Sequence, residues 1–290
     1  MVVAPPTPTS PIARPAWAAA RFGAALAVSV VAFAGLLAGA AGAAGASGAA
    51  AAQAAGDGAS AAGEVDPATL AERVAQRIEP DLGEHVAGAS VAVVAQDELV
   101  LAEGYGDADT DAGVPVTADE PAFQVGSTSK PVTWTAVMQG VEDGALDLDV
   151  DVATYLEDSA VEIDETFDEP ITLRHLATHT AGFDDPANPG AVDDADELVE
   201  LEQALAEAAP ERVRPPGETV AYSNYGTALA GHVVAEAYDT TFEAYVQDEV
   251  LGPLDMDRTT FEQPVPDEDP SRLAAPHEGF GDDLAPIERS

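Results

Sequence analysis

The sequence predicts a domain of the α/β class, in which a β-hairpin and a series of amphipathic helices follow a long uncharged N-terminal segment. Two observations support this prediction. Apolar residues recur at helical spacing in several stretches, and two short apolar runs between residues 89 and 104 are separated by a polar turn. The chain has 290 residues, of which 46% are hydrophobic, so it can form one large domain or two small ones.

The N-terminal segment has the pattern of an export signal. Residues 22–56 contain no charged side chain, their most apolar part lies at 24–37, and sites of the form Ala-x-Ala follow. We expect a secretory signal peptide within residues 1–43, with an uncleaved membrane anchor as the alternative. An Ala/Gly/Ser-rich spacer over 44–64 and a folded domain over 65–290 would follow. The protein is therefore expected to be secreted or on the cell surface, and the anchor alternative implies membrane association.

The composition is strongly acidic. The net charge is −42, and the acidic residues are spread over the whole domain rather than gathered in one tail. A nucleic-acid partner is excluded, because affinity for phosphate backbones comes largely from basic residues. Self-repulsion on this scale destabilises a fold unless salt screens it, so we expect a halophilic protein with a solvated acidic surface. The chain has no cysteine and therefore no disulfides.

The folded part is expected to begin with a helix and a hairpin. Asp66 and Pro67 suit the cap and first residue of a helix whose apolar face is Leu70, Val74 and Ile78. Strands are expected at 89–95 and 99–104, joined by a turn at 96–98.

Two later runs alternate aspartates in the manner of a calcium loop. These runs, 107–111 and 147–151, lack the glycine at the sixth position and the glutamate at the twelfth that such a loop requires. We therefore expect acidic loops there and no calcium site.

The stretch 123–141 has the strongest chemical signal. An apolar run ends at Gly126, and a helix is then predicted by the spacing of its apolar residues, Trp134, Val137, Met138 and Val141. Ser127 and Lys130 lie three apart at the start of this helix, so their side chains share one face. A serine hydroxyl becomes a nucleophile when a neighbouring base accepts its proton, and a lysine in a dry site can do so. Ser-x-x-Lys alone is a weak signal, but Lys130 is the only lysine of the chain.

The run ITLRHLATHTAGF at 171–183 predicts a short helix. Thr172 can cap it and Gly182 can end it, and the residues expected to face inward are Leu173, Leu176 and Ala177. His175 and His179 lie at i and i+4 and could chelate a metal. The run lacks the His-Glu-x-x-His arrangement and an obvious third ligand, so we expect hydrogen-bonded structural histidines and no metal. A surface helix with many acidic residues is expected over 193–208.

The run VAYSNYG at 220–226 precedes another predicted helix, whose buried side is Tyr225, Leu229, His232 and Val233. Tyr222 and Asn224 lie two apart in the turn before it. A tyrosine near a lysine can act as a base, and an asparagine amide can hold both a lysine and a substrate carbonyl. His232 is expected in the core, and one more helix is predicted from the spacing of Phe242, Tyr245, Val246 and Val250.

The three runs FQVGSTSK, ITLRHLATHTAGF and VAYSNYG, in this order, resemble the serine β-lactamase and penicillin-binding-protein superfamily. The likeness is closest to its branch of class C β-lactamases, esterases and D-alanyl-D-alanine carboxypeptidases, and it covers most of 86–261. The resemblance implies an antiparallel sheet flanked by helices, with the active site between the sheet and an all-helical lobe. It also implies that Ser127 is the acylated nucleophile, Lys130 its activating partner, Tyr222 a general base or acid, and Asn224 a ligand of the substrate and of Lys130. The backbone N–H of Ser127 would supply half of an oxyanion hole, and no cofactor is expected.

One motif of this superfamily does not match. Its Lys/His-x-Gly strand lies much further beyond Tyr-x-Asn than the 66 residues that follow Asn224. His277-Glu278-Gly279 has the right letters, but it comes too early and no β pattern surrounds it. We therefore expect a domain truncated at its C-terminus, without that strand and its oxyanion donor.

Two functions follow as expectations. The first is an exported serine hydrolase acting on an ester, amide or β-lactam, with a small molecule or peptide as substrate. The second is a catalytically incomplete or non-catalytic binding domain of the same fold.

Overall fold

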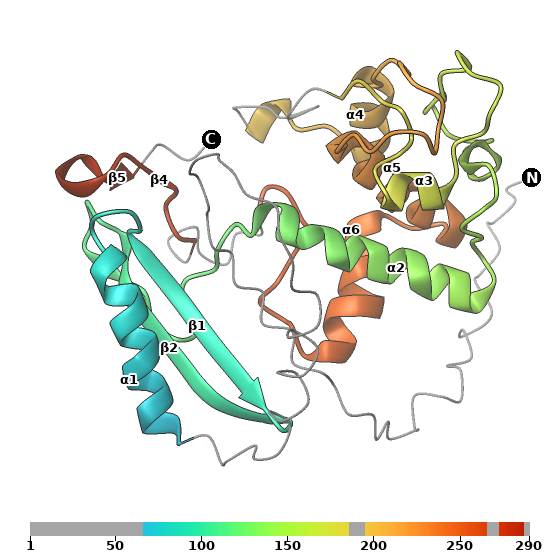
Figure 1. Cartoon of the computed structure of the whole chain (residues 1–290). Helices are drawn as coiled ribbons and strands as arrows, with labels where there is room; N and C mark the ends of the chain where they lie inside the picture. The colour runs from blue at the N-terminus through green and yellow to red at the C-terminus, as the bar shows by residue number, and fades with distance from the viewer. Residues whose placement is uncertain (1–65, 186–194, 266–272, 287–290) are drawn as a thin grey trace, which may run out of the picture. The chain divides into compact units, whose positions relative to one another are not determined.

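The structure is a computed structural model that describes residues 66–185, 195–265 and 273–286 (Figure 1). The expected signal peptide or anchor and the spacer, residues 1–64, lie outside the described residues. Within the described ranges, none of the helices has both the length and the hydropathy needed to cross a membrane.

The first helix, α1 (Pro67–Ile78), begins as the sequence predicts. The Asp66 carboxylate accepts a hydrogen bond from the backbone N–H of Thr69 at 3.1 Å, and Pro67 occupies the first turn, where its missing N–H costs nothing. Leu70, Val74 and Ile78 are half-buried, so the predicted apolar face is confirmed. A 3₁₀ turn, η2 (Glu79–Asp81), follows.

A three-stranded sheet with the order β1-β2-β3 comes next. Its strands are β1 (Gly88–Ala95), β2 (Glu98–Asp109) and β3 (Val114–Pro115). Gln96 and Asp97 form the β1–β2 turn, both with left-handed φ angles of 55° and 63°, as expected of a two-residue antiparallel hairpin. Glu98, which we expected in the turn, belongs to β2.

The predicted end of the second strand at residue 104 is wrong. β2 continues through Gly106, because the N–H of Asp107 donates to Ala87 O and that of Val116 donates to Gly106 O, both at 2.9 Å. The first acidic run therefore lies partly within a strand. At its end Asp109 Oδ1 accepts the backbone N–H groups of residues 111 and 112, so this carboxylate stabilises the turn into β3.

The 3₁₀ turn η3 (Gly126–Ser129) leads into α2 (Lys130–Asp143), which ends at Gly144 with φ 77°. Val137 is fully buried, and Trp134 and Val141 pack against the core. Met138 shares the apolar spacing that predicted this helix, but it is 50% exposed. The buried stripe of α2 contains small residues that bring it close to its neighbours: Thr133, Ala136, Val137 and Gly140.

After the 3₁₀ turn η4 (Val152–Tyr155), Thr172 and His175 form a capping box at the start of α3 (Leu173–Ala177). The side chains of Leu173 and Leu176 are buried as expected, whereas that of Ala177 is exposed. The helix ends at Thr178, earlier than the predicted end at Gly182, because His179 already has a left-handed φ of 54°.

The remaining helices surround α5 (Asn224–Tyr238). They are α4 (Leu201–Glu207) after the 3₁₀ turn η5 (Ala195–Glu197), then α6 (Phe242–Tyr245) with the π-helical segment η6 (Val246–Leu251) and the 3₁₀ turn η7 (Gly252–Leu254). Helices α2, α3, α4 and α6 all pack against α5 (Figure 1). The expected helix over 193–208 is thus two shorter pieces, and its first two residues lie outside the described part.

The core lies in these helices. The predicted buried side of α5 is confirmed, and His232 is a core residue whose Nε2 lies 2.8 Å from the Ser159 hydroxyl. The four apolar residues predicted for the helix after 241 are also buried. The hairpin contributes fewer buried side chains, among them Leu101 and Ala108. The α/β class is therefore confirmed.

The run at 277–279 lies in a separate two-stranded sheet, in which β4 (His277–Glu278) pairs with β5 (Ala285–Pro286) across the 3₁₀ turn η9 (Gly281–Asp283). The absence of a β pattern around it was thus misleading. A strand forms because the preceding backbone is held by tertiary contacts, with Ala274 N donating to Ala122 O and Ala275 N to Ala108 O, both at 2.8 Å.

The backbone at Gly182 passes close to the backbone at Arg214, and this close approach can be tested. It has φ 88°, and a Cβ placed on it would lie 2.1 Å from the carbonyl oxygen of Arg214. Gly144 has a similar φ of 77°, but a Cβ there would meet nothing within 4 Å. We expect Gly144→Ala to cost about 1–2 kcal/mol of unfolding free energy from the left-handed φ alone. Gly182→Ala should cost roughly 1–3 kcal/mol more from the clash, measured by urea unfolding in molar salt. Equal losses for the two variants would contradict this close approach.

Candidate active site

The structure brings together the four site residues predicted from the sequence. The Ser127 and Tyr222 hydroxyl oxygens lie 2.7 Å apart and share a hydrogen bond. Lys130 Nζ donates to Ser127 Oγ at 3.2 Å and to Asn224 Oδ1 at 2.7 Å. The amine thus bridges two residues that are 97 positions apart in the chain.

Two helix starts hold these side chains. Ser127 lies in η3 and Lys130 is the first residue of α2, so a turn of helix aligns the hydroxyl with the amine. Tyr222 and Asn224 flank Ser223, whose side chain caps α5 by accepting the N–H of Gly226 at 2.7 Å. Asn224, expected in the turn before this helix, is its first residue. Because α2 packs on α5, the starts of the two helices lie at one site.

The electrostatics of the site make the Tyr222 phenol more acidic than an isolated tyrosine. Hydrogen bonding from Lys130, and then from Ser127, lowers the pKa of the Tyr222 phenol below its ordinary value of 10.0. The Lys130 amine also lies 4.9 Å from the centre of the tyrosine ring. Tyr222 as a whole residue is 55% exposed. In contrast, burial raises the pKa of Tyr225 to about 12.

His179 contacts the same tyrosine, which the sequence did not indicate. Its ring lies 4.6 Å from the Tyr222 ring, centre to centre, at 38°. The backbone N–H of Ser223 donates to His179 Nδ1 at 3.2 Å, and that of Ala221 donates to the His179 carbonyl at 2.7 Å. His179 therefore holds the backbone on both sides of Tyr222. Burial, and then the charge of Lys130, lower its pKa below 6.5, which favours the neutral ring that can accept at Nδ1.

The two histidines of this run have separate partners. His175 Nδ1 interacts with the hydroxyl and backbone N–H of Thr172, whereas His179 interacts with the turn around Tyr222. Across residues 66–185, 195–265 and 273–286, no group of three or more potential metal ligands was found. In the second acidic run, Asp149 forms two hydrogen bonds with the guanidinium of Arg174, at 2.6 and 2.8 Å.

The candidate third motif, at residues 277–279, is held by contacts of His277. His277 Nε2 accepts the backbone N–H of Thr110 at 3.3 Å, and Nδ1 lies 2.8 Å from the carbonyl oxygen of Ala275. These contacts tie His277 to the turn after β2.

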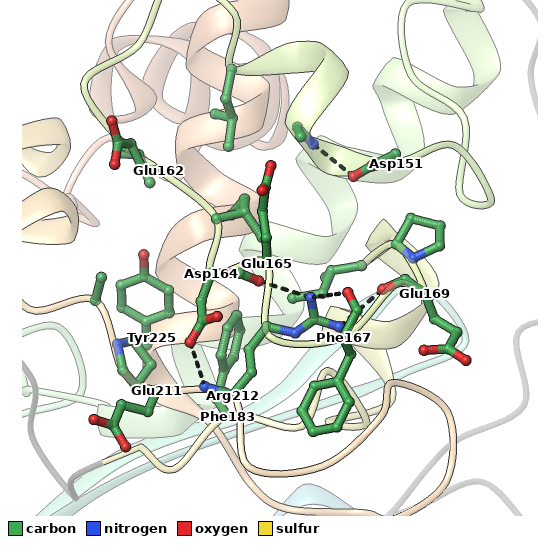
Figure 2. A pocket seen from close by; sticks show the side chains of 18 of the residues that line it. Asp151, Glu162, Asp164, Glu165, Phe167, Glu169, Phe183, Glu211, Arg212 and Tyr225 are labelled. Atoms are coloured by element: carbon green, nitrogen blue, oxygen red, sulfur yellow. Dashed lines mark hydrogen bonds between the residues drawn. The ribbon is translucent and has the colours of Figure 1, made fainter.

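A cavity of about 1150 Å³ is lined by residues other than the four of the candidate site (Figure 2). Its wall includes Glu162, Asp164, Glu165 and Glu169 and the buried Arg212. The Arg212 guanidinium donates to the backbone carbonyls of residues 164, 167 and 169 at 2.8, 3.4 and 2.9 Å. This arginine organises the loop around it, and no nucleophile or base of the Ser127 site lines the cavity.

Comparison with known proteins identifies the family. A sequence model of the family described as "Beta-lactamase" matches residues 72–287. Penicillin-binding protein 4 of Amycolatopsis lactamdurans is 34% identical over 175 residues, which are 59% of this chain and 44% of that protein. The chain therefore belongs to the β-lactamase family.

Solved structures support the same fold. The octameric penicillin-binding protein homologue from Pyrococcus abyssi matches with a TM-score of 0.62 and 26% identity, over 78% of this chain and 52% of that one. EstCE1, described as a hydrolase with promiscuous acyltransferase activity, matches with a TM-score of 0.64 and 25% identity, over 77% and 59%. The fold is thus that of the β-lactamases and transpeptidases. The chain spans less than half the length of the curated relatives that it matches.

The lowered pKa of Tyr222 can be measured directly. We expect spectroscopic titration of the tyrosines to show one phenol ionising below the ordinary value of 10.0. This early phase should disappear in Tyr222→Phe and move to higher pH in Lys130→Met, because the amine that stabilises the phenolate is removed. Tyr225→Phe is the matched control and should leave the early phase unchanged. An early phase that survives in Tyr222→Phe would show that another tyrosine is responsible.

Proposed function

We propose that this chain is a serine hydrolase that forms an acyl-enzyme on Ser127. The observation that supports this proposal is the pair of contacts at one hydroxyl: Ser127 Oγ lies 2.7 Å from the Tyr222 phenol and 3.2 Å from the Lys130 amine. A serine that contacts both a base and a cation has the arrangement that nucleophilic catalysis requires.

The proposed reaction uses these groups in order. The Tyr222 phenolate accepts the proton of Ser127 while Oγ forms a bond to the substrate carbonyl carbon, and negative charge moves to the carbonyl oxygen. When this tetrahedral intermediate collapses, the bond to the leaving group breaks and Tyr222 returns its proton to the leaving atom. Water, deprotonated by Tyr222, then attacks the acyl-serine, and the proton returns to Ser127 as the acid is released. Lys130 and Asn224 hold the nucleophile and its base in place throughout.

The alternative is a non-catalytic or incomplete domain of the same fold. It differs in a measurable way, because an inert domain would show no covalent chemistry at Ser127. The contacts around Ser127 favour the hydrolase, since a binding domain has no need for a phenol of lowered pKa against a serine hydroxyl.

The proposal also covers the class of substrate, the location of the protein and the salt concentration at which it functions. The relatives include penicillin-binding proteins and an acyl-transferring hydrolase, so the substrate proposed is an ester, amide or β-lactam within a small molecule or peptide. We also propose export, from the uncharged segment 22–56, and function at high salt, from the net charge of −42.

Covalent labelling tests the proposed chemistry. Residues 57–290 in molar salt should take up a fluorophosphonate probe or a fluorescent penicillin, and Ser127→Ala should abolish the label. Lys130→Ala should slow labelling about a hundredfold or more, because proton transfer loses its partner. Ser90→Ala is the control and should label normally, since its exposed hydroxyl donates to the carbonyl of Ala118 and not to the site. Folded parent protein that takes up neither label would favour the non-catalytic alternative.

The role of His179 predicts a distinctive pH profile. Labelling should slow as pH falls, because less Tyr222 is ionised, and the decline should steepen below pH 6.5, where a protonated His179 can no longer accept the N–H of Ser223. In His179→Asn the amide oxygen can replace Nδ1 and the residue tolerates φ 54°, so the steeper part should vanish.

His179→Ala serves as the comparison variant. It lacks the acceptor, and we expect it to label about ten- to a hundredfold more slowly than the parent wherever His179 of the parent is neutral, because Tyr222 is misplaced. A pH profile identical in the parent and in His179→Asn would show that His179 does not control the position of the base.

A further inference from the structure

A pocket of about 900 Å³ adjoins the candidate site. Its walls come from the starts of α2 and α5, and from residues 197–201, 204, 205, 208, 241–244 and 261–264. Lys130 and Asn224 both line it, so one wall of the pocket is the amine that donates to Ser127 Oγ at 3.2 Å. Its volume is within the range of small-molecule sites.

The two sides of the substrate can be assigned from the position of the proposed acid. Tyr222 must reach the leaving atom to return its proton, and Tyr222 is exposed and is not among the residues that line the pocket. The leaving group therefore lies on the open Tyr222 side. The part of the substrate that remains on Ser127 lies on the other side, toward Lys130, Asn224 and the pocket.

The pocket wall is chemically suited to an uncharged apolar group. Leu198 and Val199 are 36% and 44% exposed on a chain with a net charge of −42, and they stand on this wall. More deeply placed apolar residues on the same wall are Leu201, Leu205, Phe242 and Phe261.

The charged residues that line this pocket disfavour the binding of an anion. Of the described residues that line the pocket, four are acidic and one is a cation. The acidic residues are Glu197, Glu200, Glu243 and Glu262. The cation is Lys130, which already donates to Ser127 and Asn224. A carboxylate in this pocket would lose its hydration, and among the described lining residues no further cation could receive it.

We propose that this pocket binds the acyl group of the substrate and selects acyl groups that are uncharged, apolar and longer than acetyl. The inference rests on the proposed function, since it assumes acylation of Ser127. It narrows the substrate class to those esters or amides whose carbonyl bears a neutral hydrocarbon chain.

Hydrolysis of p-nitrophenyl esters by the full chain in molar salt tests the selectivity. We expect kcat/KM to rise at least about tenfold from acetate to hexanoate, because each added methylene that leaves water for the pocket makes binding more favourable. The hemiglutarate ester, which carries a carboxylate on a chain of similar length, should be at least about tenfold poorer than the hexanoate.

Leu198→Arg adds a cation to the wall and should narrow the gap between hexanoate and hemiglutarate. Leu254→Arg makes the same change at an exposed leucine outside the pocket, and it should leave the ratio unchanged. A flat dependence on chain length with normal labelling of Ser127, or equal effects of the two arginine variants, would overturn the pocket assignment and leave the hydrolase intact. Parent protein that neither labels nor hydrolyses any ester would overturn both.

Discussion

The bridge formed by the Lys130 amine is the interaction on which the site depends. It joins Ser127, at the entrance to α2, with Asn224, the first residue of α5, by contacts of 3.2 and 2.7 Å. These helices pack against each other through small and fully buried residues, including Ala136, Val137 and Ala230. The register of that packing fixes where the two helix starts meet. Apolar packing deep in the helical core therefore determines the geometry of a polar site at its surface.

Much of the site could be predicted because its information is local. The spacing of Ser127 and Lys130 at a helix start, and the two-residue separation of Tyr222 and Asn224, are visible in short stretches of sequence. The contact between His179 and Tyr222 could not be predicted, because it depends on a backbone reversal at a non-glycine residue 43 positions earlier. The extension of β2 past residue 104 could not be predicted from local sequence either. Its composition is typical of a turn, but hydrogen bonds with residues distant in sequence keep it in the sheet.

The scarcity of basic residues shapes how the described part of the chain is held together. The ion pairs Arg77–Asp81, Arg174–Asp149 and Arg258–Glu120 are exposed, and exposed pairs contribute little free energy. Helix caps from uncharged hydroxyls, such as those of Thr172, Ser223 and Thr241, and an apolar core provide contacts that do not depend on attraction between charges. This design suits a protein whose acidic side chains repel one another over much of its surface.

Arg212 is a buried cation that is also held by contacts other than ion pairs with carboxylates. Its guanidinium has no carboxylate partner among the described ion pairs and is instead surrounded by the backbone carbonyls of residues 164, 167 and 169. Dissolved ions screen the attraction between exposed charges, but they do not reach a short hydrogen bond between a buried guanidinium and a carbonyl dipole. The hydrogen bonds around Arg212 should therefore depend less on salt concentration than the exposed ion pairs do, so the loop keeps this attachment where surface attractions are screened.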